Sequence, residues 1–203
     1  MVFTDQILVL KLLSDMRVIG GYLKGQKILI PLDKSTRPLK DRVRQSIFNI
    51  IEHSRNENLN LNGSQILDLF AGTGSFGIEC LSRGAENVIF FENNSNSNKI
   101  LEQNLQKLEL ENKTKVLDYD SYEFKKNQLS YNKFDLIFLD PPFKDNKINK
   151  LIDKIKKINI ADKNTLIVLH RNKKTKEKIS DNLNILREEY YGISKIIFGR
   201  ILS

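Results

Sequence analysis

The stretch "ILDLFAGTGSFGIE", from Ile66 to Glu79, joins a short apolar run to a glycine-rich segment and the start of a second apolar segment. The apolar run predicts a buried strand over Ile66–Phe70, and the second segment predicts a helix over Phe76–Ser82. Three glycines follow the strand in the pattern G-x-G-x-x-G: Gly72, Gly74 and Gly77. A glycine loop between a strand and a helix lets a ligand approach the backbone closely. The stretch therefore predicts an α/β fold with a ligand near the end of its first main strand.

The same alternation of strands and helices continues to the end of the chain. Further strands are predicted at Val88–Glu92, Lys115–Leu117, Phe134–Asp140 and Thr165–Leu169, and further helices near Ser97–Lys107 and Ile148–Ile158. A final pair near Leu186–Tyr191 and Ile196–Ile201 reads as an antiparallel hairpin joined at Gly192. Such alternation is typical of a parallel sheet with helices on both faces. The predicted fold class is α/β: a Rossmann-like doubly wound sheet of about seven strands, whose last hairpin is antiparallel, with a small basic N-terminal extension.

Composition excludes several classes of protein. The single cysteine, Cys80, excludes a disulfide framework and a cysteine-built metal site, and suits a reducing cytoplasm. His53 and His170 lie far apart in sequence without a neighbouring set of metal ligands, so no metal is expected. No run of about 18 apolar residues is present, so no membrane span is predicted. The first 15 residues are interrupted by Lys11 and lack a small-residue cleavage site, which argues against a signal peptide.

Charge points to a polyanionic partner. The chain has 33 basic and 25 acidic residues, a net charge of +8 and a pI near 9.4. A lysine-rich composition would give the same excess, so the placement of the charge is more informative than its total. Residues 16–60 hold nine Lys or Arg against four Asp or Glu, with a helix predicted over Asp41–Ile51. Because arginine matches phosphate geometry better than lysine does, the arginines of this region favour contact with nucleic acid.

Three acidic residues lie in or just after the carboxyl ends of predicted strands and suggest the cofactor. Glu92 ends the second of the alternating strands, twenty residues after Gly72, where a carboxylate can bind both hydroxyls of a ribose. Asp68 lies inside the glycine motif, where it would repel a pyrophosphate but could meet the ammonium of a methionine moiety. Asp120 follows the third strand and could accept from an adenine amino group, with Asp118 as the competing candidate. The pattern favours S-adenosylmethionine over NAD.

A second motif, "KFDLIFLDPPFKDN" from Lys133 to Asn146, ends a buried strand in Asp140-Pro141-Pro142-Phe143. The prolines stiffen the chain and cannot donate hydrogen bonds to a neighbouring strand, so the strand ends here. They form a rigid corner that holds an acidic side chain and an aromatic ring close to one point. The Asp140 carboxylate and the Pro141 carbonyl could each accept one N–H of an exocyclic amine on a nucleobase, and Phe143 could stack on that base. In the alternative interpretation, Asp140 caps the strand and Phe143 is core.

Four motifs together resemble a known family. "DLFAGTGSFGIE" and "FDLIFLDPPF" resemble class I S-adenosylmethionine-dependent methyltransferases of amino groups. With "MRVIGGYLKGQKI" and "RPLKDRVRQSIFNII", the chain from Met16 onward resembles the RsmD family, which methylates the N2 amine of one guanine in small-subunit (16S) ribosomal RNA. Leu39 and Gln45 depart from the family pattern, which has Thr and Glu there.

The resemblance implies roles for residues and segments of this chain. The implied catalytic residues are Asp140, Pro141, Pro142 and Phe143. The implied cofactor-binding residues are Asp68, Phe70, Gly72, Gly74, Glu92, Asn93, Asp120 and Ser121, and the implied RNA-binding residues are Arg37, Arg42 and Arg44. The implied parts are an extra segment 1–15, expected to be dispensable, a basic RNA-contacting extension 16–60 and a methyltransferase domain 61–203.

Three other classes of function share some of these features. Asp-Pro-Pro-aromatic also occurs in DNA adenine-N6 methyltransferases, and a related motif occurs in enzymes that modify glutamine. Residues 16–60 are too few for the separate target-recognition region of a DNA enzyme, and glutamine modification would not explain the arginine-bearing helix. A ribosome-assembly protein that holds the cofactor without using it would not need an intact Asp140 and Phe143. The sequence therefore favours a ribosomal RNA methyltransferase whose partner is small-subunit RNA or the assembling subunit.

Overall fold

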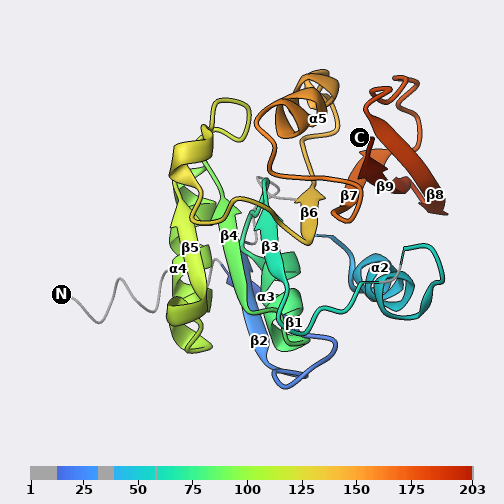
Figure 1. Ribbon diagram of the computed structural model, residues 1–203. Coiled ribbons are helices and arrows are strands. Elements are labelled where there is room, and N and C mark those ends of the chain that lie inside the picture. The colour runs from blue at the N-terminus through green and yellow to red at the C-terminus, as the bar shows by residue number, and fades with distance from the viewer. Residues whose placement is uncertain (1–12, 32–38, 58, 203) are drawn as a thin grey trace.

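The computed structural model describes residues 13–31, 39–57 and 59–202, with side chains from Met16 onward. Its centre is a seven-stranded mixed sheet with the order β5-β4-β3-β6-β7-β9-β8, and a separate two-stranded sheet joins β1 and β2 (Figure 1). The strands are β1 (Leu13–Arg17), β2 (Lys27–Pro31), β3 (Gln65–Asp68), β4 (Asn87–Phe91), β5 (Thr114–Leu117), β6 (Leu136–Leu139), β7 (Leu166–Asn172), β8 (Leu183–Tyr191) and β9 (Ser194–Ile201). The α-helices are α2 (Asp41–His53), α3 (Ser75–Ser82), α4 (Ser95–Lys107) and α5 (Ile148–Lys157).

The strand order reverses beside β3, at the middle of the large sheet. The chain runs outward from β3 through β4 to β5, then returns to place β6 on the other side of β3, and all these pairs are parallel. β7 pairs in parallel with β6, whereas β9 pairs antiparallel with both β7 and β8. The predicted fold class is therefore confirmed, including the antiparallel hairpin at the sheet edge. In a sheet of this kind, ligands bind at the carboxyl ends of the strands where the order reverses.

Alternate residues of the central strands face two separate hydrophobic cores. Leu136 and Phe138 of β6 point into the core that contains α2 and α3, whereas Ile137 and Leu139 point into the core that contains α5. All four side chains are at most 3% exposed. This is the continuous apolar run that a strand buried on both faces requires. β3 ends at Asp68 rather than at the predicted Phe70, because the chain leaves the sheet there to begin the glycine loop.

The N-terminal region packs directly on the larger sheet. Val18 and Ile28 of the β1–β2 region and Phe48 of α2 belong to the same buried cluster as α3. Asn104 of α4 accepts from the Leu29 amide at 2.7 Å and donates to the carbonyls of Leu29 and Thr73, both at 3.0 Å. One buried amide therefore joins the β1–β2 sheet to the glycine loop.

The division of the chain at residues 15 and 60 remains a prediction. Most of the segment 1–15 lies outside the described residues, but the backbone from Leu13 to Asp15 continues β1 and pairs with Leu29–Pro31. No helix in the part of the chain that the structure describes has the length and hydropathy needed to span a membrane.

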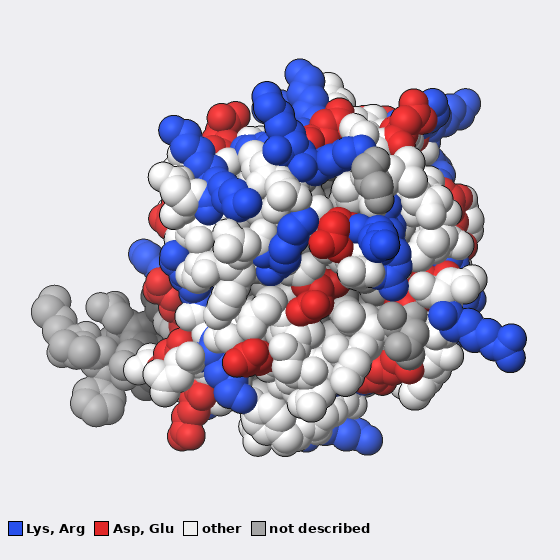
Figure 2. All heavy atoms as spheres, viewed as in Figure 1, with Lys and Arg blue, Asp and Glu red and all other residues white. Residues whose placement is uncertain are grey.

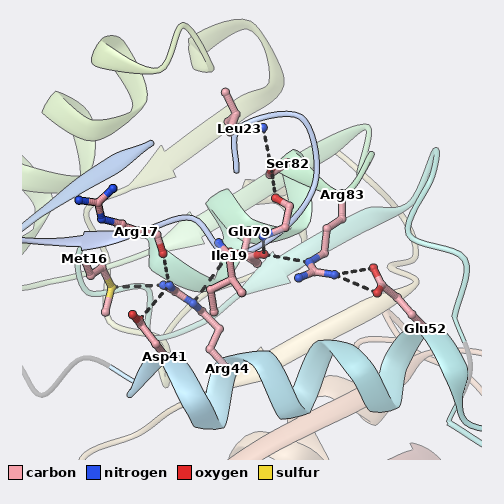
Figure 3. Close-up of polar contacts among 11 residues, drawn as sticks. Met16, Arg17, Ile19, Leu23, Asp41, Arg44, Glu52, Glu79, Ser82 and Arg83 are labelled. Atoms are coloured by element: carbon pink, nitrogen blue, oxygen red, sulfur yellow. Dashed lines mark hydrogen bonds and ion pairs between the residues drawn. The ribbon is translucent and has the colours of Figure 1, made fainter. Parts of the chain in front are cut away.

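A buried ionic cluster also links the N-terminal region to α3 (Figure 3). The two carboxylate oxygens of Glu79 accept from the amides of Ile19 at 2.8 Å and Gly20 at 2.7 Å. Arg83 donates to Glu79 at 2.9 Å and to Glu52 of α2 at 2.8 Å. Glu79 is fully buried, so its negative charge is compensated by backbone amides and arginine rather than by water.

Candidate functional site

A cavity of about 880 Å³ lies at the carboxyl ends of the central strands, where the strand order reverses. Its walls come from the glycine loop after β3, the segment after β4, the segment after β5, the Asp-Pro-Pro-Phe loop after β6, and the β7 and β9 strands. The volume is within the range of about 300–1,000 Å³ that is usual for small-molecule sites. The two sequence motifs, which are more than 60 residues apart, therefore line one site.

Nearly all of the predicted cofactor and catalytic residues line this cavity. They are Asp68, Phe70, Gly72, Glu92, Asn93, Asp120, Ser121, Asp140, Pro141, Pro142 and Phe143. Gly74 is the exception. It precedes α3 with a φ of +84°, and a Cβ atom there would lie 2.4 Å from the Leu101 side chain. Gly74 thus permits the sharp turn into α3, while its neighbours form the cavity wall.

Asp68 is a buried carboxylate whose oxygens make no hydrogen bond of normal geometry to any residue that the structure describes. Its side chain is 1% exposed. Burial raises the pKa of Asp68 to about 8, the negative charges of Asp140 and Glu92 add to this effect, and the nearby backbone amides of Gly77 and Phe70 oppose part of it. An unpaired carboxyl group beside two other acids strongly favours a cationic ligand. This environment fits the ammonium group of a methionine moiety.

Glu92 is held in place by the backbone of two loops. One carboxylate oxygen accepts from the Gly72 amide at 2.7 Å, and the other accepts from the Asn94 amide at 2.7 Å. Burial raises the pKa of Glu92, and these amide contacts oppose part of the rise. Each carboxylate oxygen has a second acceptor direction, so both can still accept from ribose hydroxyls. The geometry fits the predicted role of Glu92 as a sugar-binding residue.

Asp120 and Asp118, the two candidates for the adenine contact, differ in position within the segment after β5. Asp120 lines the cavity and accepts from the Tyr122 amide at 2.8 Å, whereas Asp118 is exposed and does not line the cavity. Tyr122 also lines the cavity, and its ring lies 5.6 Å from the Phe70 ring, centroid to centroid. The two rings give this end of the site an apolar wall suited to a flat base.

Asp140 is paired with a histidine that the sequence analysis did not include in the site. The His170 Nδ1 atom lies 2.7 Å from Asp140 Oδ1, and Nε2 lies 2.8 Å from the Ser194 hydroxyl oxygen. The Phe143 ring meets the His170 ring edge to face, with centroids 5.3 Å apart. Histidine was considered only as a metal ligand. The available signal was a polar residue in the apolar run "LIVLH", at the carboxyl end of the strand beside β6.

The three predicted RNA-binding arginines differ in their surroundings. Arg42 is exposed on α2, and Arg37 lies outside the described residues. The prediction for Arg44 is wrong, because its side chain is 0% exposed. It donates to the Arg17 carbonyl, to Asp41 at 3.1 Å and to the Met16 sulfur at 3.2 Å (Figure 3). Arg44 therefore stabilises the junction of α2 and β1 and has no surface to offer a phosphate.

Basic residues are nevertheless present at the mouth of the cavity. Lys40, Lys144 and Lys147 line it, and all three are exposed. Figure 2 shows Lys and Arg side chains interspersed with acidic ones over the face viewed there, without a single uniformly basic patch. Positive charge near the cavity mouth is suited to the phosphates on either side of an extruded nucleotide.

Comparisons with known proteins agree with this geometry. The family described as "Conserved hypothetical protein 95" matches residues 16–200. Ribosomal RNA small subunit methyltransferase D of Haemophilus influenzae is 32% identical, and the match covers 89% of this chain and 91% of the relative. The Bacillus subtilis protein YlbH, whose name gives rRNA methylation as a provisional activity, is 34% identical over 89% of this chain and 96% of its own.

A solved structure extends the similarity to three dimensions. A Haemophilus influenzae protein superposes with a TM-score of 0.73 at 30% identity, covering 94% of this chain and all of the other. The similarity includes the N-terminal region as well as the large sheet, since the family match begins at residue 16. The chain therefore belongs to the RsmD family of methyltransferases.

Proposed function

We propose that this protein transfers a methyl group from S-adenosylmethionine to the exocyclic N2 amine of a guanine in small-subunit ribosomal RNA. Membership of the family and the name of the Haemophilus influenzae relative support the RNA substrate. The observation that carries the proposal is that Asp68, with its unpaired buried carboxyl group, and the Asp140 corner line one cavity. Asp68 suits a cationic cofactor, and the Asp140 corner suits an amine.

The residues present fit the cofactor part by part. Asp68 would accept from the ammonium group, Glu92 would accept from the ribose hydroxyls, and Asp120 would accept from the adenine amino group. Phe70 and Tyr122 would pack on the adenine ring. When bound, S-adenosylmethionine supplies an electrophilic methyl group on a sulfonium centre. The remaining chemistry concerns how this chain holds the acceptor.

Asp140 and the Pro141 carbonyl would each accept one N–H of the amine. This arrangement favours a pyramidal nitrogen, whose lone pair is freed from conjugation with the ring. The amine held in this way would accept the methyl group that the bound cofactor supplies. The nitrogen would become positive and then lose one proton, which the Asp140 carboxylate can accept. Because positive charge grows on nitrogen along this path, the carboxylate stabilises the transition state more than the ground state.

Phe143 would stack on the guanine and fix its plane, which contributes about 1–3 kcal/mol per base. Alignment of the amine with the methyl group can supply about 7–11 kcal/mol of the barrier reduction. A base in a folded RNA must be extruded to reach this corner. An assembly state of the small subunit that exposes the target nucleotide is therefore the expected substrate.

Mapping of the methylated nucleotide tests the proposal. Small subunits, DNA and soluble protein from a strain that lacks the gene are each incubated with the purified protein and radiolabelled cofactor, and the products are digested for mass spectrometry. We expect label in 16S RNA as N2-methylguanine, at a position that is unmodified in the deletion strain. Label in DNA adenine or in protein glutamine would support one of the alternative classes. No transfer to any of these substrates would favour an assembly factor without catalysis.

Replacing Asp68 tests the cofactor end of the site. In the free protein Asp68 is mostly protonated at pH 7, because its pKa is raised to about 8. A bound cation favours the ionised form, so binding should release up to about one proton and affinity should rise with pH through this range. We expect Asp68→Asn to weaken binding about 10–100-fold, as for a lost charge-assisted hydrogen bond, and to abolish that proton release. Calorimetric titration in buffers of different ionisation enthalpy measures both effects.

The same raised pKa gives an independent check on folding. Between pH 3.8, the usual pKa of an aspartate, and about 8, the folded state holds a proton that the unfolded state lacks, so Asp68 lowers stability as pH rises. Asp68→Asn should remove this slope from the free energy of unfolding. Asp118→Asn, at an exposed position outside the cavity, is the matched control. Equal weakening of cofactor binding by both variants would contradict the role of Asp68.

Replacing Arg42 tests the RNA surface. Arg42 is exposed on α2, so Arg42→Ala should weaken RNA binding and reduce the slope of log K against log[salt] by about 1. Filter binding at several salt concentrations measures the slope. Lys113→Ala, which removes an exposed charge near β5, is the control and should leave the slope unchanged. An unchanged slope in the Arg42 variant would move the RNA-binding surface elsewhere.

A further inference from the structure

We infer that His170 is a positioning residue that directs the Asp140 carboxylate toward the acceptor amine; this inference rests on the proposed function. β6 and β7 are parallel, with Leu139 paired to Leu169, so the next residue of each strand, Asp140 and His170, lie side by side. His170 is 5% exposed, and its Nδ1 atom lies 2.7 Å from Asp140 Oδ1. The pairing is therefore fixed by sheet register, and its histidine is buried.

Ser194 fixes the other side of the ring. It begins β9, which pairs antiparallel with β7, and its hydroxyl oxygen lies 2.8 Å from His170 Nε2. An ionised carboxylate can only accept, so Nδ1 of His170 must carry the hydrogen that is shared with Asp140. In the neutral ring Nε2 is then the acceptor, and the Ser194 hydroxyl donates to it. Hydrogen bonds therefore run in one direction, from Ser194 through His170 to Asp140.

The consequence for Asp140 is a fixed orientation. His170 occupies Oδ1, whereas Oδ2 has no hydrogen-bond partner in the described part of the chain, and the side chain remains 20% exposed at the cavity. Oδ2 is therefore available to an amine. The hydrogen bond from His170 holds the Asp140 carboxylate in place before the substrate arrives, which is the requirement for a preorganised site.

His170 also contacts Phe143, the residue that would stack on the base. The Phe143 ring meets His170 at an interplanar angle of 79°, so the imidazole supports both the acid and the aromatic ring of the catalytic loop. A displacement of about 1 Å in either group can cost about 10²-fold in rate. His170 is thus placed to control the turnover rate without contacting the substrate itself.

Two variants separate positioning from bulk packing. His170→Ala removes the donor and should lower kcat about 10–100-fold, while the KM for RNA and the Kd for the cofactor stay nearly unchanged. His170→Asn places an N–H close to the position of Nδ1, so it should restore most of the lost kcat. A merely structural histidine would not give this rescue. Wild-type kcat in His170→Ala, or equal losses in both variants, would overturn the inference.

A spectroscopic test does not depend on methyl transfer. The chain has only two histidines, so ¹⁵N labelling gives two sets of ring signals, and His53→Gln assigns them. We expect the Nδ1-protonated form of His170 in the wild type, and loss of that preference in Asp140→Ala. An Nε2-protonated ring, or a spectrum unchanged by Asp140→Ala, would contradict the inference. If the wild type transfers no methyl group to RNA, the proposed function fails while this measurement still reports on the His170–Asp140 contact.

Discussion

Asp140→Ala is expected to lower the kcat of methyl transfer by about 10³-fold, while the affinity for S-adenosylmethionine changes little. The loss is comparable to removal of a group that stabilises charge in the transition state, which costs about 10²–10³-fold in known enzymes. Asp140 directly follows β6 and lines the cavity, but it is not among the residues that would hold the cofactor. The effect should therefore fall on the chemical step rather than on cofactor binding. Single-turnover kinetics and calorimetric titration measure the two quantities separately.

Two further variants sharpen this experiment. Asp140→Asn keeps the shape of the side chain and an oxygen that can accept from His170, but it removes the charge. A loss of rate near that of Asp140→Ala would show that charge, rather than hydrogen bonding alone, carries the effect. Asp181→Ala is the control, because Asp181 is 85% exposed and forms only a surface ion pair with Lys178. Turnover at the wild-type rate in Asp140→Ala would remove Asp140 from the catalytic machinery.

The sequence predicted the large sheet and most of the cavity for one physical reason. Runs such as Leu136–Leu139 are apolar at every position, which only a strand buried on both faces requires. Once the strands are parallel, residues at their carboxyl ends must meet at one edge of the sheet. The side chains after β3, β4, β5 and β6 were therefore predicted to converge without knowledge of any contact.

Arg44 and His170 could not be placed correctly from the sequence, because their surroundings depend on contacts between segments that are distant in the chain. Arg44 was counted as a surface charge, although it shares the buried face of α2 with Ile47, Phe48 and Ile51, at the helical spacings i+3, i+4 and i+7. Asp41 is a local carboxylate partner at 3.1 Å, but the second carboxylate, Glu79 at 3.9 Å, is distant in sequence, so the full compensation of the Arg44 charge could not be read locally. His170 was missed for a related reason, because its contact with Asp140 follows from strand register.

Glu79→Ala is expected to lower the free energy of unfolding by about 3–5 kcal/mol, the usual cost of removing one partner from a buried ion pair. The substitution would leave the amides of Ile19 and Gly20 without acceptors. It would also leave Arg83 without one of its two carboxylate partners, and the fully buried Arg44 with Asp41 as its remaining carboxylate. Equilibrium unfolding in urea, followed by circular dichroism, gives the free energy. Glu111→Ala, on an exposed 3₁₀ turn, should change it by less than about 0.5 kcal/mol.

The number of steps in the urea unfolding curve of the Glu79→Ala variant shows whether residues 16–60 fold as a separate unit. Glu79 belongs to α3, whose first residue follows the glycine loop, yet its carboxylate binds the turn between β1 and β2. If both regions fold together, the variant should unfold in one transition at lower urea with an unchanged m-value. The amides of the β1–β2 pair, which do not bond to Glu79, and those of the large sheet should then lose hydrogen-exchange protection together. An early, separate loss of protection confined to residues 16–57 would instead show an independent extension, and Glu79 would only dock it.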